Sequence, residues 1–427
     1  MKLLYHVGID DTDSKEGMCT TYIGAVVLDE LEEVGIEPVA SPHLIRLNPN
    51  WKHKTRGNCA VSFALDVDEE EVSKVKEVTL DKVGSLAEIH MEGTDPGVVF
   101  LEGDEVPPEL EEYTGRVIRE VVTMEEAEEL AGEVGAELHK FGIGRGVIGA
   151  LAAIGHPLEE DYTYELIAYR TEENRGTPRR ISGDSVRAMD EETYPETFDN
   201  LDLETGEIRI TPHTPGPILY GIRSETPEAA VEAQGLVVEE EPVERTLLYK
   251  TNQGTDEHLH PATVEDIEPY RSVIVEGVVS EGPETITGGH VFFSIEDETG
   301  EVGCAAFEPT RRFRDVVRSL VPGDRVKVYG GVKEKPDLPL TINLEKIEIL
   351  ELEPLKEETN PVCEQCGRRM TSAGRGKGYV CRRCGVELPP GASEEVEVTR
   401  GLETKLYEVP PRARRHLAKP SVRMKRN

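Results

Sequence analysis

Apolar and polar positions in the first 120 residues predict alternating strands and helices. Apolar residues recur at strand spacing and then at helical spacing, in turn along the chain. The predicted order is a strand at 3–10, a helix at 19–34, strands at 37–47 and 60–67, a helix at 69–87 and a strand at 98–101. This β-α-β-β-α-β order is typical of a ferredoxin-like α+β layer.

The pattern starts again beyond residue 120 and predicts a second α/β domain. The expected elements are helices at 124–134, 147–154 and 227–234, and strands at 162–169, 218–222 and 245–251. Residues 171–202 carry no sustained period, so we expect loops and short pieces there. The domains are therefore placed at 1–120 and 121–262, with a boundary that also allows the two to interleave.

Short β-rich runs separated by glycine and proline turns fill residues 268–353 and predict a small barrel. Five strands and a helix at 310–320, between the third and fourth strands, are typical of an OB-fold. A cysteine motif follows at 361–390, and residues 391–427 are expected to form an extended basic arm. The predicted fold class is thus a multidomain α+β protein.

Composition narrows the class of protein. The 427 residues are 37% hydrophobic and 31% charged, which suits folded domains rather than a disordered chain. No apolar run approaches the roughly 20 residues that span a bilayer, so we expect a cytoplasmic protein with no membrane partner. Four of the seven cysteines form two Cys-x-x-Cys pairs, which favours a metal over a disulfide scaffold.

The formal charge of −36 disfavours nucleic acid as a partner of the chain as a whole. Its distribution reverses that conclusion for the C-terminal part. Residues 410–427 contain no acid and seven cations, whereas runs such as Asp68–Glu71 lie in the first 360 residues. We interpret the acidic runs as solvated surface and assign no function to them.

The most specific local motif is the pair of Cys-x-x-Cys turns. Each turn points two thiolates at one centre, and four thiolates complete the closed tetrahedral site that structural Zn²⁺ prefers. Because four protein ligands leave no open position for water, we expect this zinc to be structural and not catalytic. The predicted ligands are Cys363, Cys366, Cys381 and Cys384.

Cations surround these cysteines and recur in the tail. With the adjoining barrel they predict contacts to RNA phosphates, although the cations near the thiolates would also serve simply to offset their charge. The predicted RNA-binding residues are Arg368, Arg369, Arg375, Lys377, Arg382, Arg414 and Arg415.

At the other end of the chain, three carboxylates follow the first strand. Asp10, Asp11 and Asp13 stand just before the helix that begins near Thr20. Acids beside a helix N-terminus suit Mg²⁺ and phosphate, with Thr12, Thr20 and Thr21 offering hydroxyl and backbone groups. The loop is not a Walker A loop. A solvated turn capped by Asp13 or Ser14 would fit the same residues.

Three further segments are weaker candidates. Lys54, Arg56 and Asn58 place cations and an amide around a glycine, which would suit a triphosphate or an ordinary exposed turn. Residues 142–146 form a glycine-rich turn before a helix, a plausible anion or substrate loop. Residues 194–200 mix aromatic and acidic side chains, as a cation pocket does, but a packed turn would do so too.

Taken together, these motifs resemble one archaeal family, the tRNA-isoleucine 2-agmatinylcytidine synthetases. The resemblance covers the chain from its start to the tail motif at 407–417. Besides the segments above, it rests on 44–49, 144–155 and 288–293. It implies a kinase-type domain, a ferredoxin-like domain that binds agmatine, an OB-fold and a zinc ribbon.

The resemblance also implies a reaction. ATP activates the carbonyl at carbon two of the cytosine at the first anticodon position, agmatine displaces the phosphate, and the tRNA then reads AUA. The resemblance also implies that ATP is consumed to AMP and phosphate. Asp10, Asp11 and Asp13 would hold Mg²⁺, Lys54 and Arg56 would offset phosphate charge, and Thr20 is the implied site of autophosphorylation. Agmatine is expected between residues 142 and 223, with Gly144, Arg145, Glu165 and Asp199 as its candidate contacts.

Two other functions fit part of the sequence. An OB-fold followed by a zinc ribbon also suits a non-enzymatic protein that binds single-stranded nucleic acid, although this leaves the first 260 residues without a role. An enzyme of the same shape could use ATP with a different amine. The sequence leaves the oligomeric state open.

Overall fold

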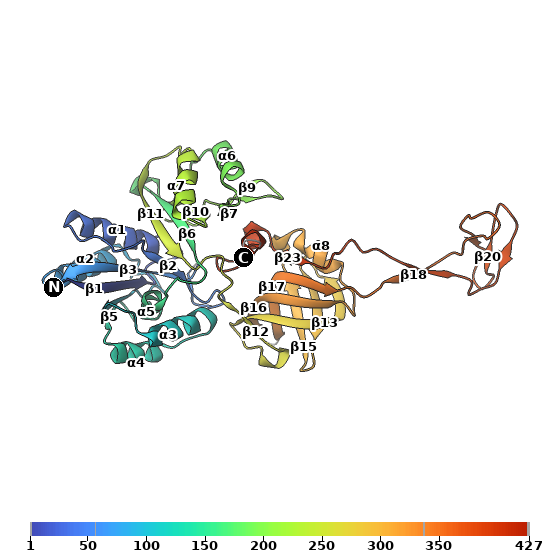
Figure 1. Ribbon diagram of the computed structural model, residues 1–427, viewed down its shortest axis with the longest axis horizontal. Coiled ribbons are helices and arrows are strands. Elements are labelled where there is room, and N and C mark those ends of the chain that lie inside the picture. Colours follow the sequence, from blue (N-terminus) through green and yellow to red (C-terminus); the bar gives the residue numbers. More distant parts are fainter. Residues whose placement is uncertain (1, 56, 336–337, 425–427) are drawn as a thin grey trace.

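Three bodies follow one another along the long axis of the molecule. The computed structural model describes residues 2–55, 57–335 and 338–424. Figure 1 shows two α/β units packed together, a barrel beside them, and a small ribbon held away from the rest on a narrow stalk. Within the described residues, no helix is both long enough and apolar enough to cross a membrane.

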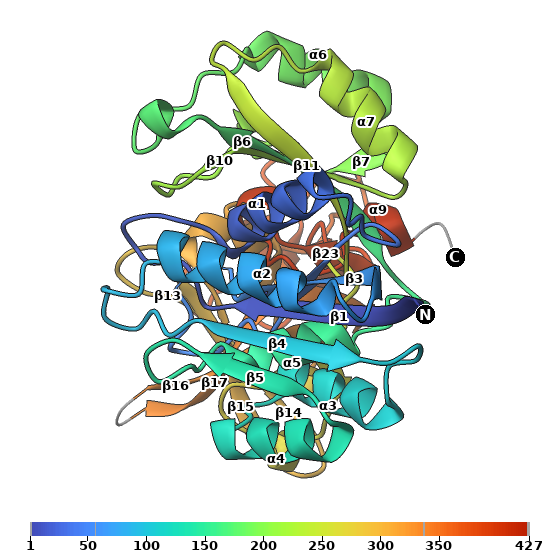
Figure 2. The same cartoon turned by 90° about the vertical axis from the view of Figure 1, so that its left-hand side faces the viewer.

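The first unit is the predicted ferredoxin-like layer with an added second face. Its strands pair in the order β5-β4-β1-β3-β2. Helices α1 and α2 cover one face, and α3, α4 and α5 cover the other (Figure 2). The elements are β1 (Lys2–Asp10), α1 (Thr20–Glu33), β2 (His43–Arg46), β3 (Cys59–Asp68), α2 (Val72–Leu86), β4 (Gly97–Glu102), α3 (Pro108–Arg119), α4 (Met124–Val134), β5 (Glu137–Lys140) and α5 (Val147–Gly155).

The packing shows no division at residue 120, because the elements that follow it complete the first unit. Helix α5 lies in the same buried core as Leu110 of α3 and Val99 of β4. The backbones also touch: a side chain at Gly8 of β1 would meet the carbonyl oxygen of Ala150 at 2.2 Å. The first unit therefore ends near residue 155.

The second unit extends the same sheet. Strand β11 runs parallel to β2, pairing Lys250 with His43 and Thr251 with Leu44, so nine strands form one sheet across both units. The predicted strands and helices are present, and α6 is an addition within the stretch expected to be loops. The elements are β6 (Thr163–Arg170), α6 (Gly183–Thr193), β7 (Thr197–Phe198), β8 (Leu201–Asp202), β9 (Glu207–Ile208), β10 (Ile218–Ser224), α7 (Pro227–Leu236) and β11 (Val243–Thr251).

The barrel has the five strands and the helix that the sequence predicts. Its inward residues form a separate core. The β13–β16 pairing closes the barrel, and β12 adds to its edge. The elements are β12 (Leu259–Pro261), β13 (Ser272–Thr285), β14 (Val291–Glu296), β15 (Glu301–Ala306), α8 (Phe313–Arg318), β16 (Arg325–Lys335) and β17 (Leu338–Glu351).

The chain leaves the barrel along a two-stranded stalk and returns along it. β18 (Lys356–Thr359) pairs with β22 (Glu394–Glu397), and the cysteine motif lies at the far end. Three short strands form the ribbon there: β19 (Thr371–Ser372), β20 (Tyr379–Val380) and β21 (Glu387–Leu388). The ribbon is thus a loop inserted between the barrel and the tail.

The extended arm expected at 391–427 is not observed in the part of the tail that the structure describes. β23 (Leu406–Glu408) pairs with β17, and helix α9 (Ser421–Met424) ends beside the second unit. We call residues 406–424 the C-terminal strap. Buried ion pairs fix it, because Arg423 contacts Glu225 at 2.7 Å and Asp161 at 2.9 Å. The arginines that suggested a free arm are used to join domains.

Candidate active site

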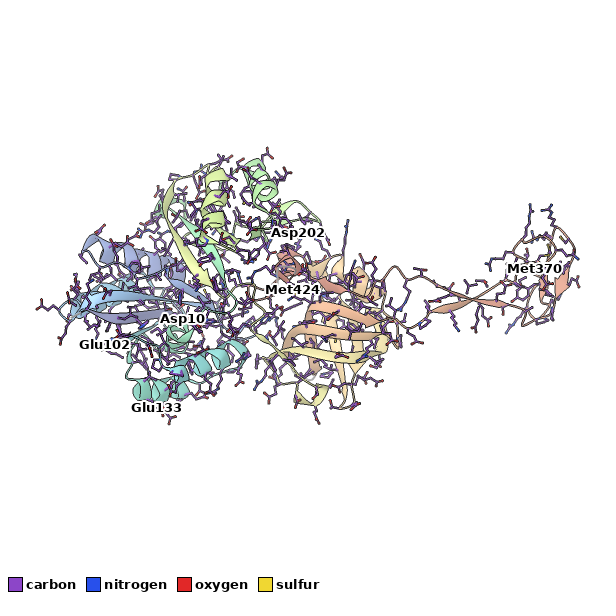
Figure 3. All side chains as sticks on the ribbon, in the orientation of Figure 1. Asp10, Glu102, Glu133, Asp202, Met370 and Met424 are labelled. Carbon is purple, nitrogen blue, oxygen red and sulfur yellow. The ribbon has the colours of Figure 1, made fainter. Side chains whose placement is uncertain are left out.

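The acidic loop sits at the C-terminal end of the central strand of the first unit. Asp10 is the last residue of β1, which lies between β3 and β4. The Asp11 backbone has a φ of 56°, a conformation that Asp tolerates better than most residues, and its N–H donates to Asp10 Oδ1 at 2.6 Å. Figure 3 shows Asp10 inside the body of the molecule, far from Met370 in the ribbon. The turn holds the acids together.

Burial and mutual repulsion make these carboxylates unusual acids. Burial, followed by the charge of Asp11, raises the pKa of Asp10 well above its usual range. Burial raises the pKa of Asp11 to about 6, although the N–H of Asp95 and the charge of Arg145 oppose this. A cation would relieve the repulsion, and an oxygen-only ligand set suits Mg²⁺. The chemistry of the donors suits the predicted metal, but Asp10, Asp11 and Asp13 do not form a close three-ligand cluster in the described structure.

Glycines of α5 make room for the acids. A side chain at Gly149 would meet Asp10 Oδ2 at 1.9 Å and Leu47 at 2.7 Å, and one at Gly146 would meet the Asp10 carbonyl oxygen at 2.5 Å. Gly146 and Gly149 are thus explained by close packing on the end of β1, whereas Gly142 and Gly144 have positive φ and face Asp95 and Lys140. The loop interpretation of residues 142–146 misses this role.

Asp95 is a site residue that sequence reasoning missed. Its N–H donates to Asp11 Oδ2 at 3.2 Å, and its carboxylate accepts from Arg145 at 3.1 Å and from the Ile143 N–H at 3.2 Å. It lies in the turn at residues 93–97, directly before β4, and that position was the available signal. Asp95 links the acidic loop to the turn before α5.

Three threonines, Thr12, Thr20 and Thr21, lie in the acidic loop and at the start of helix α1. Thr12 is fully buried, and its hydroxyl donates to Thr20 Oγ1 at 3.0 Å. Thr20 and Thr21 begin α1, whose N-cap is Cys19. Thr20 lines the first cleft described below and Thr21 the second, so the start of α1 separates the two.

Lys54 and Asn58 border the acids from the loop after β2. The Lys54 ammonium donates to the carbonyl oxygen of Pro49, and burial lowers its pKa to about 8, with Arg415 and Lys333 adding repulsion. Asn58 has a φ of 47° and donates to the carbonyl oxygen of Asn48 at 2.8 Å. Arg56 lies outside the described residues.

Two adjoining clefts meet at these residues. The first, with a cavity volume of about 110 Å³, contains the acids, Arg145, Lys54 and Asn58. The second, with a cavity volume of about 430 Å³, lies between the two α/β units and the strap. Both are lined by Asp13, Cys19, Leu47, Lys54, Gly57 and Cys59. Arg145, expected at the amine site, therefore lines the acidic cleft instead, and Gly144 lines neither.

The second cleft holds the two carboxylates expected to contact agmatine. Glu165 accepts from Arg46 at 3.3 Å and from the Gln253 side-chain amide. Asp199, with a φ of 59°, pairs with Arg223 at 3.3 Å and also with Arg414 of the strap. Both carboxylates are buried and already face guanidinium groups. Both carboxylates are thus already paired with arginines of the chain itself.

Cations dominate the rest of the second cleft. Arg415 reaches it from the strap, with Glu345 at 3.2 Å and Asn50 as partners. Besides Glu165, Asp199 and Asp13, the arginine, lysine and histidine side chains that line this cleft are Arg46, Lys54, Arg209, Arg223, Arg412, Arg414, Arg415, His213 and His416. A positively charged cleft in a chain of charge −36 is suited to an anionic substrate.

The four motif cysteines converge at the ribbon. Their ligand atoms all lie within 4.8 Å of one another, and the sulfurs of Cys366 and Cys381 are 3.6 Å apart. Thiolates bound tetrahedrally to zinc at about 2.3 Å are about 3.8 Å apart. The cluster fits zinc, and no other cluster of three or more such ligands occurs in the described residues.

The cations of the ribbon divide into two groups. Arg369 donates to Thr359 Oγ1 and, at 2.9 Å, to the Asn360 carbonyl oxygen, so it ties the ribbon to its stalk. The others are exposed, and no acidic partner is found for them within the part of the chain that the structure describes. These are Arg368, Arg375, Lys377, Arg382 and Arg383.

Comparisons with known proteins cover nearly the whole chain. Four family models match: the TCKD domain of TiaS at 6–143, the FLD domain of TiaS at 144–258, an OB-fold nucleic acid binding domain at 272–350 and the TiaS C-terminal zinc ribbon domain at 360–402. A 2-agmatinylcytidine synthetase of isoleucine tRNA, TiaS of Pyrococcus horikoshii, is 50% identical over 98% of this chain and 97% of its own length. This chain belongs to the TiaS family.

Solved TiaS structures agree with the fold. A crystal structure of apo TiaS matches with a TM-score of 0.89 at 44% identity, covering 99% of this chain and 98% of that one. A TiaS complex with isoleucine tRNA, AMPCPP and agmatine matches with a TM-score of 0.84 at 42% identity and the same coverage. The predicted multidomain α+β architecture and its zinc ribbon are confirmed.

The TiaS domain models divide the first two domains before α5. The TCKD match ends at residue 143 and the FLD match begins at 144, whereas α5 packs within the first unit. The family models therefore assign α5 to the FLD domain, whereas its packing places it in the first unit. This accounts for the difficulty of placing the boundary from sequence.

Proposed function

We propose that this chain uses ATP to join agmatine to carbon two of the cytidine at the first anticodon position of an isoleucine tRNA. The observation that carries the proposal is the pair of adjoining clefts, one acidic and one cationic, in a chain that aligns end to end with TiaS. The first cleft would activate the base, and the second would bring the base and agmatine together.

Activation is required because a ring carbonyl is a poor electrophile until its oxygen carries phosphate. We assign Asp10, Asp11 and Asp13 to hold Mg²⁺, which when bound would offset the charge of the ATP phosphates. Lys54 and Arg145 line the same cleft and would stabilise the transferring phosphate. Arg56 is retained as a candidate from the sequence.

Thr20 is the proposed site of autophosphorylation. Its side chain lines the first cleft at the start of α1, and its hydroxyl oxygen accepts from Thr12 at 3.0 Å. Backbone N–H groups at the start of α1 would donate to phosphate oxygens. Phosphorylation would put a new anion at the junction of the two clefts.

Agmatine is proposed to bind in the second cleft. Its guanidinium would exchange with an arginine at Glu165 or Asp199, where carboxylates already pair with guanidinium groups. Its amine then attacks carbon two of the cytosine: the C–N bond forms, the bond from carbon two to the phosphorylated oxygen breaks, and the amine loses one proton. Phosphate leaves with the oxygen.

RNA binding is assigned to the exposed cations of the ribbon and to the cationic second cleft. The target cytidine leaves its stack to enter this cleft, which costs a few kcal/mol. Arg414 and Arg415, expected on a free arm, would act from the cleft wall. We place the protein in the cytoplasm, a reducing compartment that suits seven cysteines, none of which forms a disulfide.

One assay separates this function from its alternatives. The full-length protein is incubated with transcribed isoleucine tRNA, labelled agmatine and labelled ATP. We expect AMP formation that depends on tRNA and incorporation of agmatine into the tRNA. Binding of tRNA without AMP formation would favour the non-enzymatic protein, and AMP formation without incorporation of agmatine would favour another amine.

A further inference from the structure

We propose that His416 of the C-terminal strap donates a hydrogen bond to the phosphorylated oxygen of the activated cytidine while agmatine displaces that oxygen. This inference rests on the proposed function and adds a residue to its second step. The residues assigned above act on the triphosphate or on agmatine. The oxygen that leaves in the second step gains negative charge and needs a donor of its own.

His416 lies where the two clefts meet. It lines the second cleft, and its Nε2 is 3.4 Å from the position that a Cβ atom of residue 57 would take. Gly57 itself lines both clefts. Arg46 Nη1 is 2.7 Å from the same Cβ position, so a guanidinium and an imidazole nitrogen converge beside one residue. Two donors that converge in this way can stabilise a negative charge that develops between them.

Arg223 fixes which nitrogen of the His416 ring carries the proton. The Nη2 atom of Arg223 lies 2.8 Å from His416 Nδ1, and an arginine side chain can only donate. Gln253 Oε1 lies 3.0 Å from the same nitrogen, but a hydrogen bond from a charged donor is about twice as strong as a neutral one. We therefore assign the lone pair to Nδ1 and, in the neutral ring, the proton to Nε2.

The charges around the ring keep it neutral. Burial lowers the pKa of His416 well below its usual range, and the charges of Arg46, Arg223 and Lys54 lower it further. A neutral imidazole with its proton on Nε2 is a donor and a weak base, so it suits the leaving oxygen better than the proton of the amine. Among the described residues, Nε2 has no hydrogen-bond partner, which leaves this donor available to a substrate.

The strap holds His416 in place before any substrate binds. The Gly254 N–H donates to the His416 carbonyl oxygen at 2.8 Å, and the Asp256 N–H donates to that of Leu417 at 2.8 Å. Leu417 is buried in the core of the first unit, and Figure 1 shows the C-terminal end of the chain between the α/β units and the barrel. A donor that is already fixed needs no reorganisation during the reaction.

The second step balances with His416 as a donor only. The agmatine amine attacks carbon two of the cytosine and the C–N bond forms. The bond from carbon two to the phosphorylated oxygen breaks, and its electron pair goes to that oxygen. The proton that the amine loses ends on the departing phosphate. His416 keeps its own proton, and its N–H stabilises the oxygen while negative charge develops there.

The test compares the two steps in the full-length protein under single-turnover conditions. The first step is followed as AMP formation with tRNA and ATP in the absence of agmatine, and the second as incorporation of labelled agmatine. His416→Phe keeps a flat ring and removes the donor. We expect its AMP formation to stay within about threefold of wild type and its incorporation at saturating agmatine to fall about 100-fold.

Two further variants separate the donor from the shape of the ring. His416→Gln offers an amide N–H in place of Nε2 and should recover at least about tenfold of the lost incorporation rate. His90→Phe is the matched control, because His90 is an exposed histidine that lines neither cleft. It should match wild type in both steps.

A purely structural role for His416 would give a different result. If the imidazole only holds the strap against the first unit, His416→Phe should slow both steps equally and His416→Gln should recover neither, which would overturn the proposal. A raised KM for agmatine with an unchanged maximal rate would also overturn it, because His416 would then contact the amine. A wild-type protein that forms no AMP would instead refute the proposed function, so the two failures are distinguishable.

Discussion

At the residue scale, a substitution in the acidic loop tests whether the proposed chemistry depends on residues other than those that bind RNA. Asp11→Asn keeps the shape of the side chain but removes a charge from the proposed metal site. We expect the rate of tRNA-dependent AMP formation to fall at least about 100-fold, because electrostatic stabilisation of the transferring phosphate is lost. The tRNA dissociation constant should stay within about twofold, as measured by filter binding.

Asp81→Asn is the matched control for this change. Asp81 is an exposed carboxylate of α2, with a side-chain exposure of 69%. It should alter neither AMP formation nor tRNA binding. Loss of tRNA affinity in Asp11→Asn alone would contradict the division of labour between the first cleft and the RNA-binding surfaces.

Glu345 makes the stability of the barrel–strap contact depend on pH. Burial raises the pKa of this carboxyl, but the charges of His258, Arg415 and Lys346 outweigh burial and lower it from 4.5 to about 2. A carboxyl whose pKa is lower in the folded than in the unfolded protein stabilises the fold at pH values above its unfolded pKa. This contribution to stability is lost as the pH falls toward 2. The shift corresponds to on the order of 3 kcal/mol.

We therefore expect Glu345→Gln to lower the unfolding temperature clearly at pH 6 and much less at pH 3, as measured by differential scanning calorimetry. Glu351→Gln, at the exposed end of the same strand, should differ little from wild type at both values. A gap between Glu345→Gln and wild type that is as large at pH 3 as at pH 6 would contradict the assigned ion pairs.

Residues that are neighbours in sequence were the ones that sequence reasoning found. The aspartates at the end of β1 and the four cysteines were predicted from their spacing in the sequence. Asp95 and Arg46 do not, because their roles come from partners 84 and 119 positions away, Asp11 and Glu165. Contacts of this kind depend on sheet order and are invisible to local patterns.

At the element scale, α5 carries a constraint that its composition hides. Gly149→Ala would drive a methyl group into Asp10 Oδ2, 1.9 Å from the ideal Cβ position. We expect it to cost about 1–3 kcal/mol of stability and most of the ATP turnover. Gly132→Ala in α4 meets nothing within 4 Å and should stabilise the protein by about 0.5–1 kcal/mol.

Thermal unfolding and AMP formation measured on the two variants test this directly. The pair differ only in what surrounds the added methyl group, since both glycines are helical. Full activity in Gly149→Ala would show that the Asp10 carboxylate tolerates displacement. Lost activity in Gly132→Ala would show that helix α4 contributes to the site.

The elements that were predicted have strong periodicity, and those that were missed do not. Helix α4 has its expected bounds, and the five barrel strands that the sequence predicts are present. Helix α6 buries only Val186, Met189 and Thr193 among acidic residues, which is too few apolar positions to define a period. β23 is three residues long and exists because β17 offers an edge. Tertiary contact, not local propensity, forms such elements.

At the scale of the whole molecule, positively and negatively charged residues are concentrated in different regions. The strap brings arginines from the C-terminal end into the second cleft, while the ribbon holds others at the end of a stalk (Figure 1). Stalk strands β18 and β22 carry five glutamates between them. If RNA binds the two cationic surfaces as proposed, the acids between them would disfavour its contact with the stalk.

We therefore expect the ribbon to bind tRNA and to take no part in catalysis. Replacing Cys366 and Cys384 with serine removes two of the four thiolates and should unfold the zinc site, since such sites fold with their metal. We expect tRNA affinity to fall at least about tenfold and to depend less steeply on salt, because fewer phosphate contacts remain. ATP binding in the first cleft should be unchanged.

Gln365→Ala, an exposed position between two of the cysteines, is the control and should bind tRNA normally. Binding is measured by filter retention at several salt concentrations, and ATP binding by equilibrium dialysis. A double serine variant that keeps its tRNA affinity but loses ATP turnover would mean that the ribbon acts on the active site. Because the ribbon lies at the far end of the stalk from Asp10, such a result would require the stalk to bend or the tRNA to carry the effect.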